Sequence, residues 1–291
     1  MDVNPQSDPS PGSSSAATPA FSDDTEADEN ADKTESPFGF AWFLVKLVLA
    51  VLILRSFVIA PFSIPSESML PRLWHGDFLI ATKWSYGYSS FSLPLNAPLI
   101  PGRIFASDPQ RGDVVIFKHP IDHVDYVKRV IGLPGDTIEM RNGQIVLNGA
   151  PVSKERIGNF TFEVSPYAPC RKSGTEEALA ANRQTCSYSR FRERLPDGMT
   201  YEVLDFGAAP GDFTSPTTVP EGHIFVLGDN RDFSRDSRFP ALAGDAVGLV
   251  PQANLVGRAT LIFWSTDGSA EWLKPWTWFT SARWDRIGTT L

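Results

Sequence analysis

The sequence contains little cysteine and little histidine for its length. Its 291 residues include two cysteines, Cys170 and Cys186, and four histidines. Two thiols are too few for a four-thiolate zinc site or a disulfide-rich miniprotein, and they form either one disulfide or two free thiols, depending on the compartment. No H-E-x-x-H pattern occurs, and we interpret His119 and His123 as solvated loop residues without a third ligand nearby. We therefore expect no metal ion and no other cofactor.

Several familiar catalytic signatures are also missing. The sequence contains neither G-x-G-x-x-G nor G-x-x-x-x-G-K-[ST], which removes the usual signs of dinucleotide binding and of P-loop hydrolysis. It lacks G-x-S-x-G, and none of its lysines follows a serine by three positions. These absences remove the signatures of the α/β-hydrolases and of the penicillin-binding enzymes.

An excess of positive charge is missing as well. The formal net charge is −8, and residues 1–37 account for all of it, with nine acidic side chains and one basic one. The remaining 254 residues are neutral, with 25 bases and 25 acids. A nucleic-acid-binding domain would carry a basic excess, so we expect no nucleic-acid partner. Residues 1–37 also have almost no large apolar side chains, which predicts a disordered acidic tail.

Residues 38–60 have the opposite composition. The stretch from Phe38 to Phe62 is long enough and apolar enough to cross a bilayer as a helix. Lys46 and Arg55 interrupt it, but Arg55 lies near one end, where its side chain can reach the interface. A buried amphipathic helix is the alternative, but no polar stripe supports it. We predict a single transmembrane anchor, whose orientation the flanking basic residues do not determine.

After Pro61, short β-branched and aromatic runs alternate with Gly, Pro, Asn and Asp, which predicts a mostly β protein built from antiparallel sheets. Two Asn-Gly pairs, at 142–143 and 148–149, are typical of hairpin turns. The predicted strands are Phe78–Lys83, Asp113–Phe117, Tyr126–Ile131, Thr137–Val146, Ile224–Leu227 and Ala259–Trp264.

The same pattern suggests a domain organisation. A catalytic β domain would comprise residues 61–149 and 221–268, interrupted by a more polar insert at 150–220 that forms a smaller cap domain, with one short helix near Glu176–Arg183. A C-terminal segment, 269–291, contains four tryptophans, at 272, 276, 278 and 284. Such a segment either rests on the bilayer or packs as an aromatic element, and both alternatives stay open.

Three sequence boxes carry the chemical signal. The first is Ile64-Pro65-Ser66-Glu67-Ser68-Met69-Leu70-Pro71, directly after the apolar stretch. The second runs from Asp125 to Asp136 (DYVKRVIGLPGD) and follows Arg111-Gly112-Asp113-Val114-Val115. The third runs from Gly228 to Arg238 (GDNRDFSRDSR). Any one of these boxes alone is a weak signal, but the three boxes together, in this order, form a specific sequence signature.

In these boxes the chain resembles the bacterial type I signal peptidases (leader peptidases), a family of serine/lysine peptidases. The resemblance covers about residues 61–140 and 220–265 and the apolar stretch before them. It implies that Ser68 is the nucleophile and Lys128 the general base. It also implies that Ser66 and the Ser68 N–H form an oxyanion hole, and that Ser234 positions the lysine. Asp236 and Arg238 are implied as structural supports, with Asp229 at the turn of the box.

Elementary chemistry supports the role of Lys128. A lysine at its usual pKa of about 10.4 is protonated at neutral pH, but burial can lower that pKa by about 3–5 units. Strand alternation places Tyr126, Lys128 and Val130 on one face, where an amine can be buried. Lys118 has no such setting, and we interpret it as a solvated surface lysine.

By the same resemblance the substrate is a secretory preprotein with small residues before the scissile bond. We expect it to pair as an added strand with Phe62–Pro65 and Val115–Lys118. Candidate substrate-binding residues are Phe62, Ile64, Pro65, Met69, Tyr126 and Val127. Three residues depart from the family pattern and bear on efficiency: Glu67, Arg72 and Phe233.

The sequence thus predicts a membrane-anchored serine endopeptidase that cleaves signal peptides and acts as a monomer. The resemblance implies a bacterial inner membrane, with a cytoplasmic N-terminus and a periplasmic catalytic domain. That location would place both cysteines in an oxidising compartment. The alternatives are a maturation peptidase for one substrate, such as a pilin, and an inactive anchored scaffold protein with the same fold.

Overall fold

The computed structural model describes residues 37–291, apart from 94–95, 166–167, 171–174, 180–182 and 272. The predicted acidic tail, except for its last residue, and one of the four C-terminal tryptophans therefore lie outside the described residues. The chain divides into two compact units, residues 1–44 and 45–291. Each unit is described by itself.

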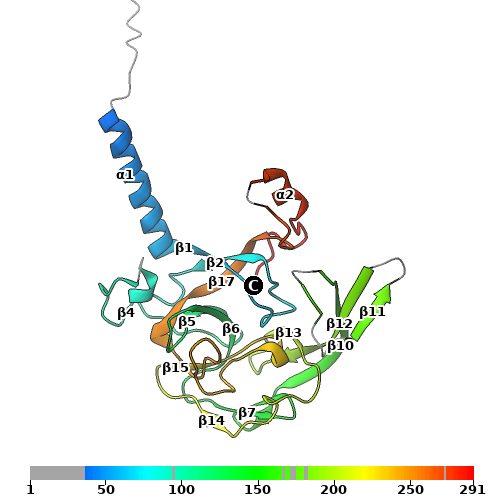
Figure 1. The fold of residues 1–291 in the computed structure, drawn as a ribbon. Helices are drawn as coiled ribbons and strands as arrows, with labels where there is room; N and C mark the ends of the chain where they lie inside the picture. Colours follow the sequence, from blue (N-terminus) through cyan, green and yellow to red (C-terminus); the bar gives the residue numbers. More distant parts are fainter. Residues whose placement is uncertain (1–36, 94–95, 166–167, 171–174, 180–182, 272) are drawn as a thin grey trace, which may run out of the picture. The chain divides into compact units, whose positions relative to one another are not determined.

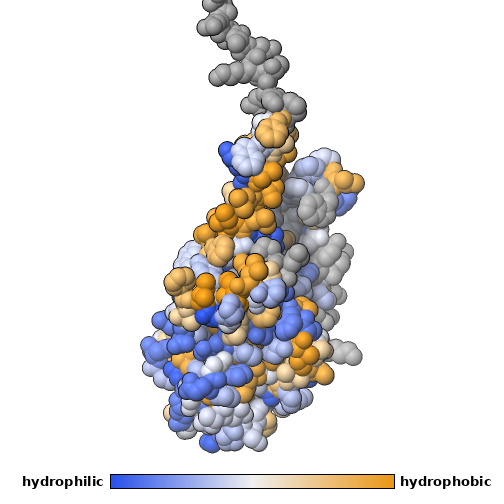
Figure 2. Space-filling model, turned by 90° about the vertical axis from the view of Figure 1, so that its left-hand side faces the viewer, coloured by the Kyte–Doolittle hydropathy of each residue, from blue (hydrophilic) through white to orange (hydrophobic). Residues whose placement is uncertain are grey.

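The apolar stretch forms the helix that the sequence predicts. Helix α1 (Pro37–Ile53) continues through one π-helical turn, η1 (Leu54–Val58), and Figure 2 shows it covered with hydrophobic side chains. Residues 38–58 are long and apolar enough to cross a membrane, since 21 residues rise about 31 Å and the hydrocarbon core is about 30 Å thick. The helix ends at Ile59, because the residues before Pro61 favour an extended backbone.

The largest sheet carries most of the predicted strands. Its order is β1-β2-β17-β5-β6-β15-β16, and all its pairings are antiparallel (Figure 1). The strands are β1 (Ile59–Ser63), β2 (Asp77–Thr82), β5 (Val114–Lys118), β6 (Asp125–Gly132), β15 (His223–Leu227), β16 (Val250–Pro251) and β17 (Leu255–Ser265). The predicted mostly β, antiparallel fold is confirmed.

A second sheet contains the two predicted hairpin turns. It has the order β14-β7-β8-β9, with β7 at Thr137–Arg141, β8 at Gln144–Leu147, β9 at Ala150–Pro151 and β14 at Thr217–Thr218. Asn142 and Gly143 both have positive φ angles, of 50° and 71°, as a type I′ turn requires. The pair at 148–149 has the same conformation and joins β8 to β9. A separate two-stranded sheet pairs β3 (Tyr88–Ser89) with β4 (Arg103–Ile104).

The segment that was predicted to be a smaller domain forms a further sheet. Its long strands β10 (Ser153–Glu163) and β12 (Arg183–Arg194) pair with each other, and β12 also pairs with β11 (Thr175–Leu179) and β13 (Thr200–Leu204). The short helix predicted near Glu176–Arg183 is wrong, because the described residues of that range lie in strands: residues 176–179 in β11 and Arg183 in β12. The backbone groups of β11 bond to β12 instead of to one another, and such tertiary pairing overrides weak helix propensity.

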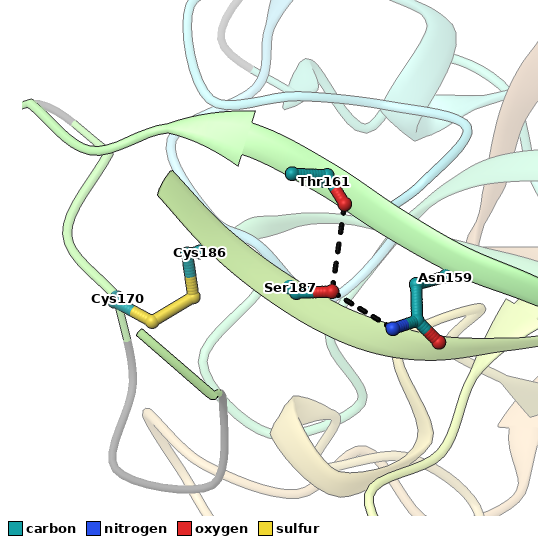
Figure 3. Close-up of a disulfide and its surroundings, with 5 residues drawn as sticks. All are labelled: Asn159, Thr161, Cys170, Cys186 and Ser187. Carbon is teal, nitrogen blue, oxygen red and sulfur yellow. Dashed lines mark hydrogen bonds between the residues drawn. A yellow bond between two sulfur atoms is a disulfide. The ribbon is translucent and has the colours of Figure 1, made fainter. Parts of the chain in front are cut away.

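The two cysteines form a disulfide within this sheet region. Cys170 and Cys186 have Cα atoms 5.4 Å apart, and Cys186 lies on β12 (Figure 3). On the same strand, the Ser187 hydroxyl accepts hydrogen bonds from the Asn159 amide at 2.9 Å and the Thr161 hydroxyl at 3.4 Å. These side-chain contacts connect β12 to β10 beyond their backbone pairing.

The C-terminal segment contains a short helix, α2 (Pro275–Thr280), and exposed aromatic side chains. Trp284 packs edge-to-face on Trp264 of β17, with ring centroids 5.9 Å apart, whereas Trp276 is 65% exposed. Trp284 thus packs against the sheet, while Trp276 is largely exposed to solvent. Contact of this segment with a bilayer stays a prediction.

Two isoleucine-to-alanine substitutions, one at a buried and one at an exposed strand position, test the assignment of the core. Ile116 of β5 is fully buried and packs in one core cluster with Ile64 and Met69, whereas Ile104 of β4 is 43% exposed. We expect Ile116→Ala to lower the free energy of unfolding by about 2–5 kcal/mol, because it leaves a cavity. Ile104→Ala should cost less than about 1 kcal/mol. Equal losses in urea unfolding of the two variants would contradict this assignment of the core.

Candidate active site

Ser68 and Lys128 meet at the centre of the site. Lys128, in the first half of β6, donates a hydrogen bond from Nζ to Ser68 Oγ at 2.7 Å and a second one to the Val127 carbonyl at 3.1 Å. Ser68 is 7% exposed and Lys128 is 4% exposed. The two residues lie 60 positions apart in the sequence, and the fold brings them into direct contact.

The surroundings of Lys128 lower the pKa of its amine. Burial lowers the pKa of Lys128 to about 8, although Asp236 and Asp229 act in the opposite direction. Neither carboxylate forms an ion pair with the amine among the described residues, and the ring of Tyr126 lies 5.8 Å from Nζ. An amine in such a setting can accept a proton near neutral pH.

The remaining predicted site residues lie around this pair. Ser66 Oγ is 3.3 Å from Ser68 Oγ, and its residue is exposed. A cavity of about 380 Å³ opens beside the two serines and Lys128. Its lining includes all six candidate substrate-binding residues: Phe62, Ile64, Pro65, Met69, Tyr126 and Val127.

Two strand edges face this cavity without a partner. β1 is the edge strand of its sheet, and the residues that follow it, 64–66, line one wall. The opposite wall includes the start of β6, residues 125–128, which pair with β5 on one side only, because β15 joins β6 from Arg129 onward. An extended peptide between these segments would lie against the unpaired edges of β1 and of the start of β6.

The expected pairing of substrate with Val115–Lys118 is wrong for most of that strand. β5 lies inside the sheet, where Val115, Ile116 and Phe117 pair with β6 on one side and with β17 on the other. Its backbone groups in this range are therefore already bonded to the protein. The free edge belongs to the neighbouring strand, β6.

Residues of the third box hold the backbone of the nucleophile segment. The Asn230 N–H donates to the Ser68 carbonyl at 3.0 Å, and its side-chain amide donates to the Glu67 carbonyl at 3.1 Å. At Gly228 a Cβ atom would lie 2.5 Å from the Ser68 carbonyl oxygen and 2.3 Å from Ser234 Oγ. Only glycine permits this close approach. Asn230 was not among the site residues predicted from the sequence, although the third box contains it.

Ser234, Asp236 and Arg238 support the box from inside. Asp236 accepts from the Arg238 guanidinium at 2.8 Å and from the Gly228 N–H at 3.0 Å. Burial raises the pKa of the Asp236 carboxyl, but Arg238 and these hydrogen bonds outweigh it, and the net shift is downward. Ser234 Oγ is buried and makes no hydrogen bond of good geometry among the described residues, so the expected bond to Lys128 is not formed here.

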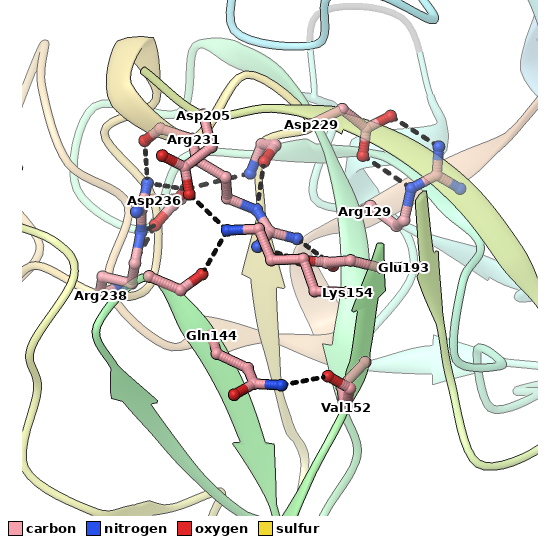
Figure 4. A network of polar contacts seen from close by, with 12 residues as sticks. Arg129, Gln144, Val152, Lys154, Glu193, Asp205, Asp229, Arg231, Asp236 and Arg238 are labelled. Atoms are coloured by element: carbon pink, nitrogen blue, oxygen red, sulfur yellow. Dashed lines mark hydrogen bonds and ion pairs between the residues drawn. The ribbon is translucent and has the colours of Figure 1, made fainter. Parts of the chain in front are cut away.

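Figure 4 shows two further buried ion pairs. Arg129, next to Lys128, makes a bidentate contact with Asp229 at 2.7 and 2.6 Å. Arg231 contacts Glu193 of β12 in the same manner, at 2.7 and 2.5 Å. Glu193 lies outside every sequence motif, and no local pattern distinguished it from the exposed charges around it.

The three departures from the family pattern occupy different places. Phe233 lines the cavity beside Ser68 and Lys128, and its ring packs on that of Phe206, with the ring centroids 5.5 Å apart. Glu67 is half-buried beside Ser68, while its carbonyl is held by Asn230. Arg72 points toward the end of the chain and bonds to the Thr290 carbonyl. Arg72 therefore does not contribute to the cavity around Ser68.

The histidines do not assemble into a metal centre. Among the described residues, no group of three or more His, Cys, Asp or Glu side chains could hold a metal ion. The expectation that His119 is solvated is wrong: the ring is fully buried, Nε2 contacts the Ala246 carbonyl at 3.0 Å, and the ring lies 5.1 Å from Tyr126. His123 is exposed, as expected.

Comparison with known proteins identifies the family. The model of the family described as signal peptidase, peptidase S26, matches residues 38–264. The chain belongs to this family. Signal peptidase I of Rickettsia typhi is 37% identical over 237 residues, which cover 78% of this chain and 80% of the relative. Signal peptidase I of Rickettsia conorii is 35% identical over 254 residues, which cover 84% of each chain.

Membership of the signal peptidase family makes the chain a peptidase, in agreement with the sequence-based resemblance. A crystal structure of a signal peptidase I from Enterococcus faecalis V583 is also similar, at 28% identity. The match covers 52% of this chain and 97% of that one, with a TM-score of 0.27.

The ion pair between Arg231 and Glu193 offers a test of how the site is supported. Both side chains are buried, at 1% and 0% exposure. Arg231→Met should lower the free energy of unfolding by about 3–5 kcal/mol, because it leaves the Glu193 carboxylate buried and unpaired. The double variant Arg231→Met/Glu193→Met should recover most of that loss. Additive losses in a double-mutant cycle would show that the two charges do not depend on each other.

Proposed function

We propose that this chain is a membrane-anchored serine endopeptidase that removes signal peptides from secretory preproteins. Ser68 is the nucleophile and Lys128 is the general base. The observation that carries the proposal is the hydrogen bond of 2.7 Å between Lys128 Nζ and Ser68 Oγ, made by an amine that is buried without a paired carboxylate. A surface lysine would have neither this partner nor this pKa.

The reaction follows from this contact. Ser68 Oγ attacks the carbonyl carbon of the scissile bond while its proton passes to Lys128 Nζ. The tetrahedral intermediate collapses as the ammonium returns the proton to the leaving amine. This step leaves an acyl-enzyme and frees the mature protein. Water then attacks the ester, again giving its proton to Lys128, and Ser68 is regenerated with release of the signal peptide.

The developing oxyanion needs donors close to Ser68. The exposed hydroxyl of Ser66, next to Ser68 Oγ, and the Ser68 N–H are the groups that we assign to this role. One such donor typically contributes about 2.7–4 kcal/mol to the stabilisation of the transition state. Asn230 acts through the backbone: its side-chain amide holds the Glu67 carbonyl, which shares a planar peptide unit with the Ser68 N–H, and so fixes the direction of that N–H.

The substrate would lie as a strand between the free edges of β1 and β6. Its side chains would then alternate between the cavity and solvent, which favours small residues at two positions separated by one. Phe62, Ile64 and Tyr126 would form apolar walls of this cavity. Phe233 would narrow it from the side of the third box.

The apolar helix at residues 38–58 would anchor the enzyme in the membrane. By the family resemblance, we propose the inner membrane of a bacterium, with the N-terminus in the cytoplasm and the catalytic residues in the periplasm. An oxidising compartment would suit the disulfide between Cys170 and Cys186. We expect the enzyme to act as a monomer.

A cleavage assay tests the catalytic pair. Full-length protein in detergent is incubated with a preprotein that carries a small-x-small site. We expect Ser68→Ala and Lys128→Ala to reduce the rate by more than about 10³-fold, because they remove the nucleophile and its base. Ser215→Ala and Lys274→Ala, at exposed positions away from the cavity, should cleave as the wild type does.

The outcomes of this assay also separate the alternatives. Unchanged cleavage by Lys128→Ala would contradict the proposed base. No cleavage of any preprotein by the wild-type chain would favour an inactive scaffold. Cleavage of a pilin precursor alone would favour a dedicated maturation peptidase.

The pH dependence of the reaction gives an independent test. Lys128 must be neutral to accept the proton, and its pKa is lowered to about 8. We therefore expect kcat/KM to rise about tenfold per pH unit below this value and to level off above it. Lys128→Arg should be inactive throughout, since a guanidinium stays protonated. A wild-type profile that keeps rising to about pH 10, the ordinary lysine value, would contradict the assignment.

A further inference from the structure

A second buried lysine, Lys83, lies outside the catalytic site. It follows β2 directly and is 5% exposed, yet its amine has one hydrogen-bond partner among the described residues, the Ser92 carbonyl at 2.7 Å. The described residues give this amine no ion pair with a carboxylate. A buried ammonium without an opposing charge is costly, so the environment of Lys83 favours either a neutral amine or a bound anion.

Lys83 lines a cavity of about 330 Å³ that has an excess of positive charge. Arg55 and Lys118 line the same space, with Asp125 as the single carboxylate. Asp125 already pairs with Lys118 at 2.9 Å. Arg55 is exposed, and its side chain makes no hydrogen bond or ion pair with any described residue. Two cations, Arg55 and Lys83, are therefore left without an anionic partner in one cavity.

The rest of the cavity is amphipathic. Leu52, Phe91 and Leu93 contribute apolar walls, and Ser56 and Asn96 contribute polar groups. Burial, and to a smaller extent Arg55, lowers the pKa of Lys83 to about 8, so near neutral pH the amine is mostly protonated. An occupant that suits all these groups has a negative charge, several hydrogen-bond acceptors and an apolar portion.

The position of the cavity narrows the choice of occupant. Leu52, Arg55 and Ser56 belong to the last turns of the apolar segment, residues 38–58, where a membrane anchor would leave the hydrocarbon core. At that depth the surrounding medium is the headgroup layer, which is rich in phosphodiesters. Arginine and lysine are the usual ligands of phosphate oxygens.

We propose that this cavity binds the phosphate of an anionic phospholipid headgroup, with Lys83 and Arg55 as its cationic ligands. The site is separate from the catalytic pair, although Phe62 and Asp125 line both cavities. The inference rests on the membrane anchoring proposed above. It would give the protein a preference for a class of lipid, in addition to its anchor.

Retention of lipid by the full-length protein tests the site. The chain is released from mixed micelles with equal amounts of phosphatidylglycerol and phosphatidylcholine, and the lipids that remain bound are counted by native mass spectrometry. We expect the wild type to retain phosphatidylglycerol in preference. Arg55→Gln and Lys83→Met should each lower that retention by about tenfold, the equivalent of one lost charge-assisted contact.

Arg194→Gln serves as the matched control, because Arg194 is an exposed arginine of β12 that does not line the cavity. It should retain lipid as the wild type does. Arg55 is also exposed, so Arg55→Gln remains informative if Lys83→Met fails to fold. Equal retention of both lipids, or unchanged retention in Arg55→Gln, would overturn the proposal.

Two competition experiments distinguish a phospholipid from free phosphate and from substrate as the occupant of the cavity. Inorganic phosphate that displaces phosphatidylglycerol at equal concentration would show a site for free phosphate and overturn the lipid assignment. Excess preprotein added to inactive Ser68→Ala should leave the lipid bound, and its displacement would assign the cavity to substrate. Preprotein cleavage by the wild type is measured in parallel: equal retention of both lipids by a wild-type protein that cleaves normally would contradict this inference alone.

Discussion

The site depends on one amine, Lys128 Nζ, that is buried without an ion pair to any carboxylate of the described residues. Lys128 is buried against Ser68, and the nearby carboxylates that could form an ion pair with it are engaged elsewhere: Asp229 with Arg129, and Asp236 with Arg238. If either acid were free to reach Lys128, the ammonium form would be stabilised, and Lys128 could not serve as the base that we propose. The buried arginines therefore control the charge of the lysine indirectly, because they occupy its potential partners.

Much of the fold and the site could be predicted from the sequence. The β strands of the large sheet follow from local alternation, and the Asn-Gly turns follow from their need for positive φ angles. Ser68 and Lys128 lie in boxes whose order is itself informative. These features could be predicted because each one depends on residues that are close together in the sequence.

The errors share a different cause. The short helix near Glu176, the solvated His119 and the free edge at Val115 all depended on which neighbour each segment meets in space. β11 pairs with β12, His119 packs on Tyr126, and β5 is enclosed by two strands. Glu193 was missed for the same reason, since its importance comes from Arg231, 38 residues away. Long-range partners of this kind have no local signature in a single sequence.

The open strand edges at the cavity have a consequence for the behaviour of the free protein. An exposed edge strand is a template on which another chain can add, including a second copy of the same protein. β1 contains Pro61, and Pro65 follows it shortly, so the edge lacks two of the backbone donors that a long ladder would use. Such an edge can accept a short, transient peptide but offers a poor start for a growing sheet. Pro61 and Pro65 thereby make this open edge a poor template for aggregation.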